Sequence, residues 1–130
     1  MAEINTFEDL IVWQKAHGLF LEAARDSEQF PNGRAANVIA NQLLRSASSI
    51  SAIIAEGFGR RMGKEYTHYL IVARGSTTET IDWYLKCRDL HLTTPEIFKE
   101  RRGILDQVLK MLNRMVSQQL NRRLANSLTH

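Results

Sequence analysis

The chain has 130 residues, which is enough to bury a hydrophobic core as one domain without disulfides or a structural metal. Cys87 is the single cysteine, and this excludes an internal disulfide framework and a thiolate metal site. The formal net charge is only +3, but residues 97–130 hold seven Lys or Arg against two Asp or Glu, a net charge of +5. A basic segment suits an anionic partner such as nucleic acid, although a solvated basic helix face has the same composition.

The first ten residues, MAEINTFEDL, contain three acidic side chains and no apolar run, so we expect no secretory leader. No apolar run approaches the ~20 residues that a membrane-spanning helix requires. The sequence therefore predicts a cytoplasmic protein with no membrane partner.

Two helices are predicted in the first half of the chain, over residues 6–28 and 34–58. Thr6 or Asn5 is the expected N-cap of the first helix, and the segment Phe30-Pro31-Asn32-Gly33 ends it. The second helix has apolar or small residues at every third or fourth position, the spacing of a buried helix face.

Two more helices are predicted over residues 63–90 and 94–124. Gly75 lies in the middle of the third helix, where it costs ~1 kcal/mol relative to Ala, so we expect a close packing contact there. Thr94 and Pro95 are the expected N-cap and first residue of the fourth helix. The fourth helix carries an apolar stripe too wide for one bundle seam, which predicts a further partner surface: Ile104, Leu105, Val108, Leu109, Met111, Leu112, Met115 and Val116.

Long helices joined by short loops pack against their neighbours in antiparallel fashion. The sequence therefore predicts an all-α protein, an up-down-up-down antiparallel four-helix bundle, with residues 1–130 forming one domain. If the second and third helices form a hairpin that turns near residues 61–62, Arg45 and Glu79 face each other. We expect a partly buried ion pair between them.

Several short motifs occur in order between residues 7 and 85, including Phe7-x-Asp9-Leu10-x-Val12-Trp13-Gln14-Lys15-Ala16, Phe30-Pro31, Gln42-x-x-Arg45-Ser46-Ala47, Ile54-Ala55-Glu56-Gly57-Phe58-Gly59-Arg60, Lys64-Glu65-Tyr66 and Ala73-Arg74-Gly75-Ser76. In this order and spacing they resemble the four-helix-bundle family of proteins encoded in intervening sequences of bacterial 23S ribosomal RNA genes. The resemblance implies a closed homopentamer. It also implies kinship with accessory proteins of diversity-generating retroelements, which bind nucleic acid and assist a reverse transcriptase.

The chain departs from the family pattern at two positions of the second helix. Ser51 stands where the family has a proline, and Ile53 stands where it has an asparagine. The missing proline predicts a straighter helix, and any role of the asparagine is absent from this chain.

The sequence offers little support for catalysis. A di-metal site in a bundle needs two Glu-x-x-His motifs, and Glu65-Tyr66-Thr67-His68 is the single copy. No nucleophile elbow and no phosphate-binding glycine loop is present. We therefore expect neither a catalytic residue, nor a metal, nor a cofactor.

Three classes of function remain open: a pentameric scaffold that binds RNA or DNA, a protein-only adaptor that docks a partner on the apolar face of the fourth helix, and a metal-dependent enzyme. The basic clusters favour the first class, because cations along a surface bind phosphates without reading bases. Surface ion pairs with nearby carboxylates are the competing interpretation of the same residues. The expected nucleic-acid-binding residues are Arg60, Arg61, Lys64, Arg101, Arg102, Arg122 and Arg123.

Overall fold

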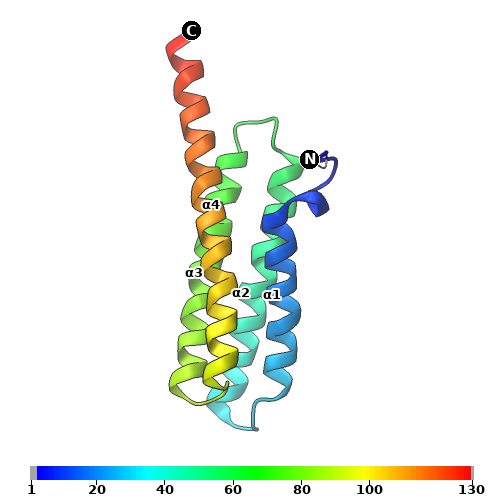
Figure 1. The fold of residues 1–130 in the computed structure, drawn as a ribbon, viewed down its shortest axis with the longest axis vertical. Helices are drawn as coiled ribbons and strands as arrows, with labels where there is room; N and C mark the ends of the chain where they lie inside the picture. Colours follow the sequence, from blue (N-terminus) through cyan, green and yellow to red (C-terminus); the bar gives the residue numbers. More distant parts are fainter. Residues whose placement is uncertain (1–2, 130) are drawn as a thin grey trace.

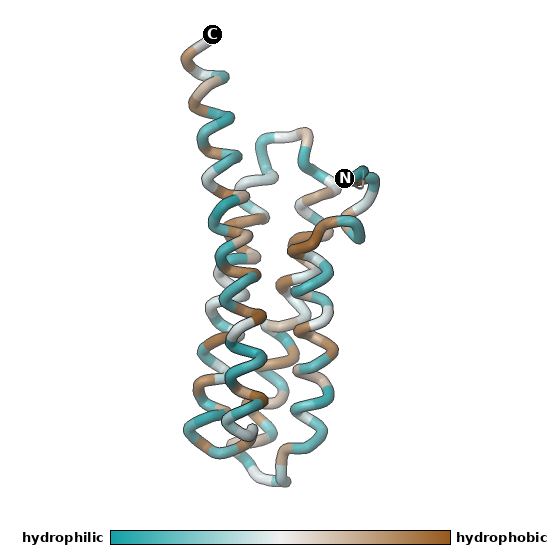
Figure 2. The backbone as a smooth tube through the Cα atoms, viewed as in Figure 1, coloured by the Kyte–Doolittle hydropathy of each residue, from teal (hydrophilic) through white to brown (hydrophobic). Residues whose placement is uncertain are grey.

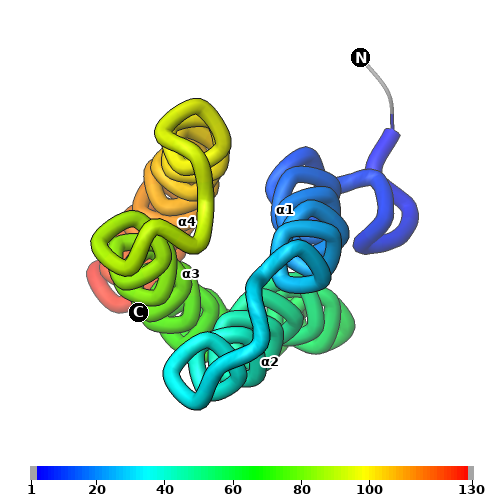
Figure 3. Tube along the Cα trace, turned by 90° about the horizontal axis from the view of Figure 1, so that it is seen from below, coloured from blue at the N-terminus to red at the C-terminus, as the bar shows by residue number. Residues whose placement is uncertain are grey.

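The structure is a computed structural model that describes residues 3–129. Within this range the chain forms one short 3-10 helix and four α-helices (Figure 1). The helices run up and down in turn and follow one another around the bundle in chain order (Figure 3). The predicted all-α fold of four helices is therefore confirmed. The elements are η1 (Phe7–Asp9), α1 (Ile11–Glu28), α2 (Arg34–Gly59), α3 (Tyr66–Asp89) and α4 (Pro95–Thr129).

The helix predicted over residues 6–28 is interrupted near its start. Asp9 accepts hydrogen bonds from the backbone N–H groups of Asn5 (2.8 Å) and Thr6 (3.0 Å), and this capping box closes the short turn of η1. Leu10 then adopts an extended backbone, with φ of −75° and ψ of 124°, so α1 starts only at Ile11.

The bounds of the later helices also differ from the prediction. Residues 60–65 form turns, so α3 begins at Tyr66 rather than at residue 63. The fourth helix is predicted to end at residue 124, but α4 continues to Thr129, and His130 lies outside the described residues. Residues 107–129 contain no Gly or Pro and are rich in Leu, Arg and Gln, which have high helix propensity.

The core lies along the facing sides of all four helices, and every helix carries both hydrophobic and hydrophilic residues (Figure 2). α2 has the length and apolar composition of a membrane span, alone among the helices of the described residues. Its apolar face packs into the bundle core, and the helix runs unbroken through Ser51. The apolar composition of α2 is therefore explained by its place in the bundle core.

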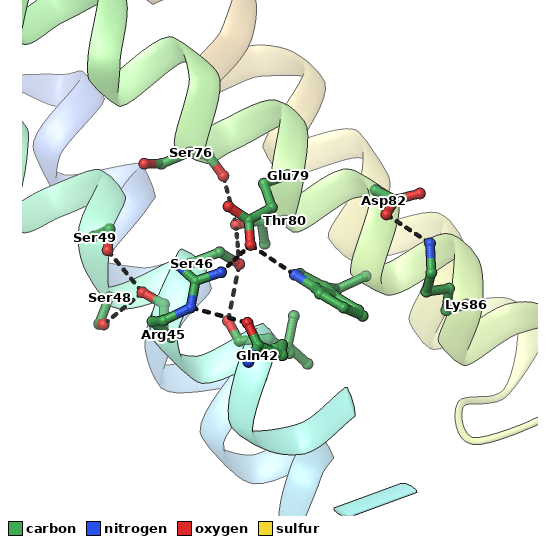
Figure 4. Close-up of polar contacts among 12 residues, drawn as sticks. Gln42, Arg45, Ser46, Ser48, Ser49, Ser76, Glu79, Thr80, Asp82 and Lys86 are labelled. Carbon is green, nitrogen blue, oxygen red and sulfur yellow. Dashed lines mark hydrogen bonds and ion pairs between the residues drawn. The ribbon is translucent and has the colours of Figure 1, made fainter. Parts of the chain in front are cut away.

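Small residues let α2 and α3 approach closely. The buried hydroxyl of Thr80 donates to the hydroxyl of Ser46 at 2.8 Å across the two helices (Figure 4). Close by, Arg45 and Glu79 form an ion pair, and Glu79 also accepts a hydrogen bond from the Trp83 indole at 2.9 Å. The pair was expected to be partly buried, but its side chains are 55% and 37% exposed, so it contributes little stability.

The glycine that permits the approach is Gly57, not Gly75. A Cβ atom at Gly57 would lie only 2.7 Å from the Cβ atom of Tyr69 on α3, whereas one at Gly75 would meet nothing within 4 Å. The prediction of a close contact at Gly75 is therefore wrong, because this residue lies on the exposed side of α3.

We predict that Gly57→Ala lowers the free energy of unfolding by about 1–3 kcal/mol, because the added methyl group forces α2 and α3 apart. Gly75→Ala is the matched control and should raise it by about 0.5–1 kcal/mol, since Ala favours a helix more than Gly does. Urea denaturation monitored by circular dichroism measures both changes. Equal effects of the two substitutions would contradict this account of the packing.

Candidate nucleic-acid interface

One end of the bundle carries both the loop between α2 and α3 and the part of α4 that extends past the other helices (Figure 1). Between these two walls lies a cleft of about 580 Å³. We call it the basic cleft, and its lining residues are Arg61, Met62, Gly63, Lys64, Thr67, Gln119, Arg122, Arg123 and Asn126. Four of the seven predicted nucleic-acid-binding residues thus come together, although they are about 60 positions apart in the sequence.

The loop wall is built around Arg61. Its guanidinium carbon lies 3.9 Å from the centre of the Phe58 ring, and its Nη1 donates a hydrogen bond of 2.9 Å to the Phe58 carbonyl oxygen. Phe58 is itself buried at the end of α2. Because these contacts hold the Arg61 side chain in place, binding an anion there costs less side-chain entropy than at a free surface arginine.

The cleft is strongly cationic. Its lining holds four cations and no carboxylate, and within residues 3–129 none of the four forms an ion pair. Burial raises the pKa of the neighbouring Tyr66 hydroxyl, while the charges of Arg61 and Arg122 act to lower it. Cations from both walls therefore act on the same point, which is the arrangement that attracts an anion.

Arg60 belongs to the same loop but not to the cleft lining. Its Nη1 donates to Glu65 at 2.9 Å, and its Nη2 lies 4.0 Å from Glu56. Its guanidinium also lies 5.5 Å from the centre of the Tyr69 ring. Two carboxylates thus offset its charge, and the structure separates it from Arg61.

The prediction that Arg101 binds nucleic acid is wrong, because this side chain is buried and only 7% of the residue is exposed. Its Nε and Nη2 donate to the two carboxylate oxygens of Asp26 at 2.9 and 3.0 Å. Tyr84 donates to the same Asp26 at 2.7 Å, and burial together with this hydrogen bond raises the pKa of Tyr84. Glu22 and Glu100 lie 3.1 and 2.6 Å from the guanidinium.

Helical spacing accounts for the burial of Arg101. The residue precedes Leu105 by four positions and Val108 by seven, so it stands on the face of α4 that packs into the core. This spacing could have predicted the burial of Arg101, but Arg101 was grouped with its neighbour Arg102 on residue type alone.

Arg102 is placed far from the basic cleft. Twenty residues of α-helix, about 30 Å, separate it from Arg122 along α4. It is 40% exposed and forms an ion pair of 3.0 Å with Asp106. The structure therefore does not join Arg102 with the four cations of the cleft.

Sequence reasoning missed the remaining side chains of the cleft. Gln119 and Asn126 lie on the same face of α4 as Arg122 and Arg123, since these positions recur at intervals of three and four residues. The sequence shows this periodicity. It does not show that the loop wall lies opposite these residues, because that depends on how far α4 extends past the loop.

Other chemistry finds little support in the described part of the chain. No group of three or more His, Cys, Asp or Glu side chains there could hold a metal ion. Glu65 pairs with Arg60, and the His68 ring meets the edge of the Tyr69 ring, with 6.0 Å between the ring centres. Burial raises the pKa of the Cys87 thiol to about 12, so this cysteine stays protonated and is a poor nucleophile.

The fold defines an all-α protein built on a four-helix bundle with a basic cleft at one end. The sequence matches the family of the 23S rRNA-intervening sequence protein over residues 8–114, and the chain belongs to this family. Among solved structures, its fold is similar to a protein of unknown function from the S23 ribosomal protein family of Bacteroides thetaiotaomicron. That structure has a TM-score of 0.72 and 20% sequence identity, with 82% of this chain and 98% of the other covered. No curated protein matches the sequence.

The family match has a consequence for the cleft. It includes the loop wall with Arg61 and Lys64 but ends at residue 114, before the α4 wall with Arg122 and Arg123. One wall therefore lies within the family's matched region, and the other lies beyond it.

We predict that Arg101→Gln lowers the free energy of unfolding by about 3–5 kcal/mol, because it leaves the buried Asp26 carboxylate without its cation. Arg102→Gln, one residue along, breaks an exposed pair and should cost at most about 1 kcal/mol. Denaturant unfolding of both variants measures the difference. Similar losses in the two variants would contradict a structural role for Arg101.

Proposed function

We propose that the protein is a non-enzymatic scaffold that binds RNA through the basic cleft and acts in the cytoplasm. The observation that carries this proposal is the convergence of four cations, from two elements distant in the sequence, on one cleft; within residues 3–129 these cations form no ion pair and the cleft lining holds no carboxylate. Clustered Lys and Arg side chains bind phosphates and release condensed counterions, so binding of this kind weakens steeply as salt rises.

The arrangement favours phosphate contacts over base readout. Arg61 is held against Phe58, and the α4 wall presents Arg122 and Arg123 next to each other on one helix. Such contacts set position and orientation on a nucleic acid but carry no sequence information. We therefore propose binding that is largely independent of RNA sequence.

We further propose that the scaffold is a homopentamer, as the resemblance to the family implies. A specific feature supports self-association: an apolar pocket of about 290 Å³ lies at the seam between the N-terminal segment and α4, lined by Ile4, Leu10, Ile11, Val12, Met111, Arg114 and Met115. Five copies would present five basic clefts to one RNA, and linked sites bind far more tightly than a single site.

The same apolar pocket supports a second candidate function, that of an adaptor which docks another protein. Met111 and Met115 are only partly buried there, and methionine side chains adapt to varied apolar partners. The two functions differ in their salt dependence, since an apolar contact does not weaken as salt rises.

Fluorescence anisotropy with a labelled structured RNA tests the proposed function, using protein whose oligomer mass has been determined by light scattering. We predict that Arg122→Gln/Arg123→Gln weakens binding and flattens the slope of log K against log salt by about 0.9 for each lost phosphate contact. Lys99→Gln/Lys110→Gln, which removes two exposed cations elsewhere on α4, should change the slope much less. Absence of binding at low salt, or equal effects of the two double variants, would refute the proposal.

A further inference from the structure

We infer that the form of RNA held in the basic cleft is a double-helical stem rather than a single strand. This inference rests on the proposed function and adds the structural class of the ligand. It is carried by what lines the two walls of the cleft and by what is missing from that lining.

Within residues 3–129, none of the nine residues that line the cleft carries an aromatic ring on which a base could stack. The rings of Phe58 and Tyr66, which neighbour the cleft residues in the chain, are buried, and the Arg61 guanidinium covers the Phe58 face. Proteins that hold single strands depend on base stacking against aromatic side chains or Arg guanidinium planes, and in a double helix the bases already stack on one another. A stem therefore needs no stacking partner in this cleft, whereas a single strand has only the guanidinium planes of Arg61, Arg122 and Arg123.

The charges of the cleft also favour a double helix. Two strands carry twice the phosphate charge per unit length of one strand, and each neutralised phosphate releases more condensed counterion from a duplex. For four contacts, the salt slopes of about −0.9 and −0.7 per contact make the stem gain roughly sixfold in affinity over the single strand as salt falls from about 1 M to about 0.1 M. The four cations are Arg61 and Lys64 on one wall and Arg122 and Arg123 on the other.

Both walls of the cleft present cations to one ligand. The loop wall and the α4 wall each contribute two of them. Gln119 also lines the cleft, and its amide can both donate and accept a hydrogen bond. Double-stranded RNA is recognised through its phosphates and 2′-hydroxyl groups, so these side chains match what a stem displays.

The test compares a labelled RNA hairpin stem with an unstructured RNA strand of the same length and base composition. Anisotropy titrations of the full chain across salt should give the tighter binding and the steeper slope for the stem. Lys64→Gln and Arg123→Gln, one from each wall, should each flatten the stem slope by about 0.9. Arg122→Lys/Arg123→Lys keeps both charges and should retain stem binding, which separates loss of charge from loss of fold.

Equal or tighter binding of the single strand would overturn the inference and leave the proposed RNA-binding function standing. Stem binding that responds to only one wall would overturn it as well. If the wild-type chain binds neither RNA, the proposed function itself fails.

Discussion

Arg101 reaches from α4 into the core and donates two hydrogen bonds, of 2.9 and 3.0 Å, to the Asp26 carboxylate of α1, which also accepts from Tyr84 of α3. A buried charge must keep its partner, since leaving either group alone in the core is costly. Three helices are thereby tied at one level, and a shift of α4 along its axis or about it would break these bonds. The position at which the far end of α4 extends past the bundle follows from this constraint.

The basic cleft depends on a second constraint, the close packing of α2 and α3. Gly57 lies against Tyr69, and this contact holds the last turn of α2 where Phe58 can support Arg61. With α4 fixed by Arg101, the loop cations line one cleft together with Arg122 and Arg123. The buried contacts of Arg101 and the packing of Gly57 therefore position the basic cleft at the end of the bundle, although the cleft cations do not themselves pack in the core.

Much of the fold could be predicted from the sequence, because apolar spacing and the loop signals at Pro31, Gly33 and Pro95 mark the helices directly. The Arg45–Glu79 pair followed from hairpin geometry, but its exposure did not, since exposure depends on neighbouring side chains. The seven predicted basic residues illustrate the limit for the site. A residue's type does not reveal whether it faces the core or the solvent, so Arg101 was wrongly assigned to the nucleic-acid surface. Arg60 and Arg102 were grouped with the cleft cations, but in the structure each forms an ion pair with a carboxylate and neither lines the cleft.

Hydrogen–deuterium exchange of the full chain, with and without a structured RNA, locates the binding surface most directly. The end of α4 has few tertiary contacts, so its amides should exchange quickly in the free protein. The account predicts that RNA slows exchange in residues 61–67 and 117–128 and leaves the start of α4, around Arg102, unchanged. Protection confined to the Arg102 end of the bundle, with no change at the cleft, would contradict it.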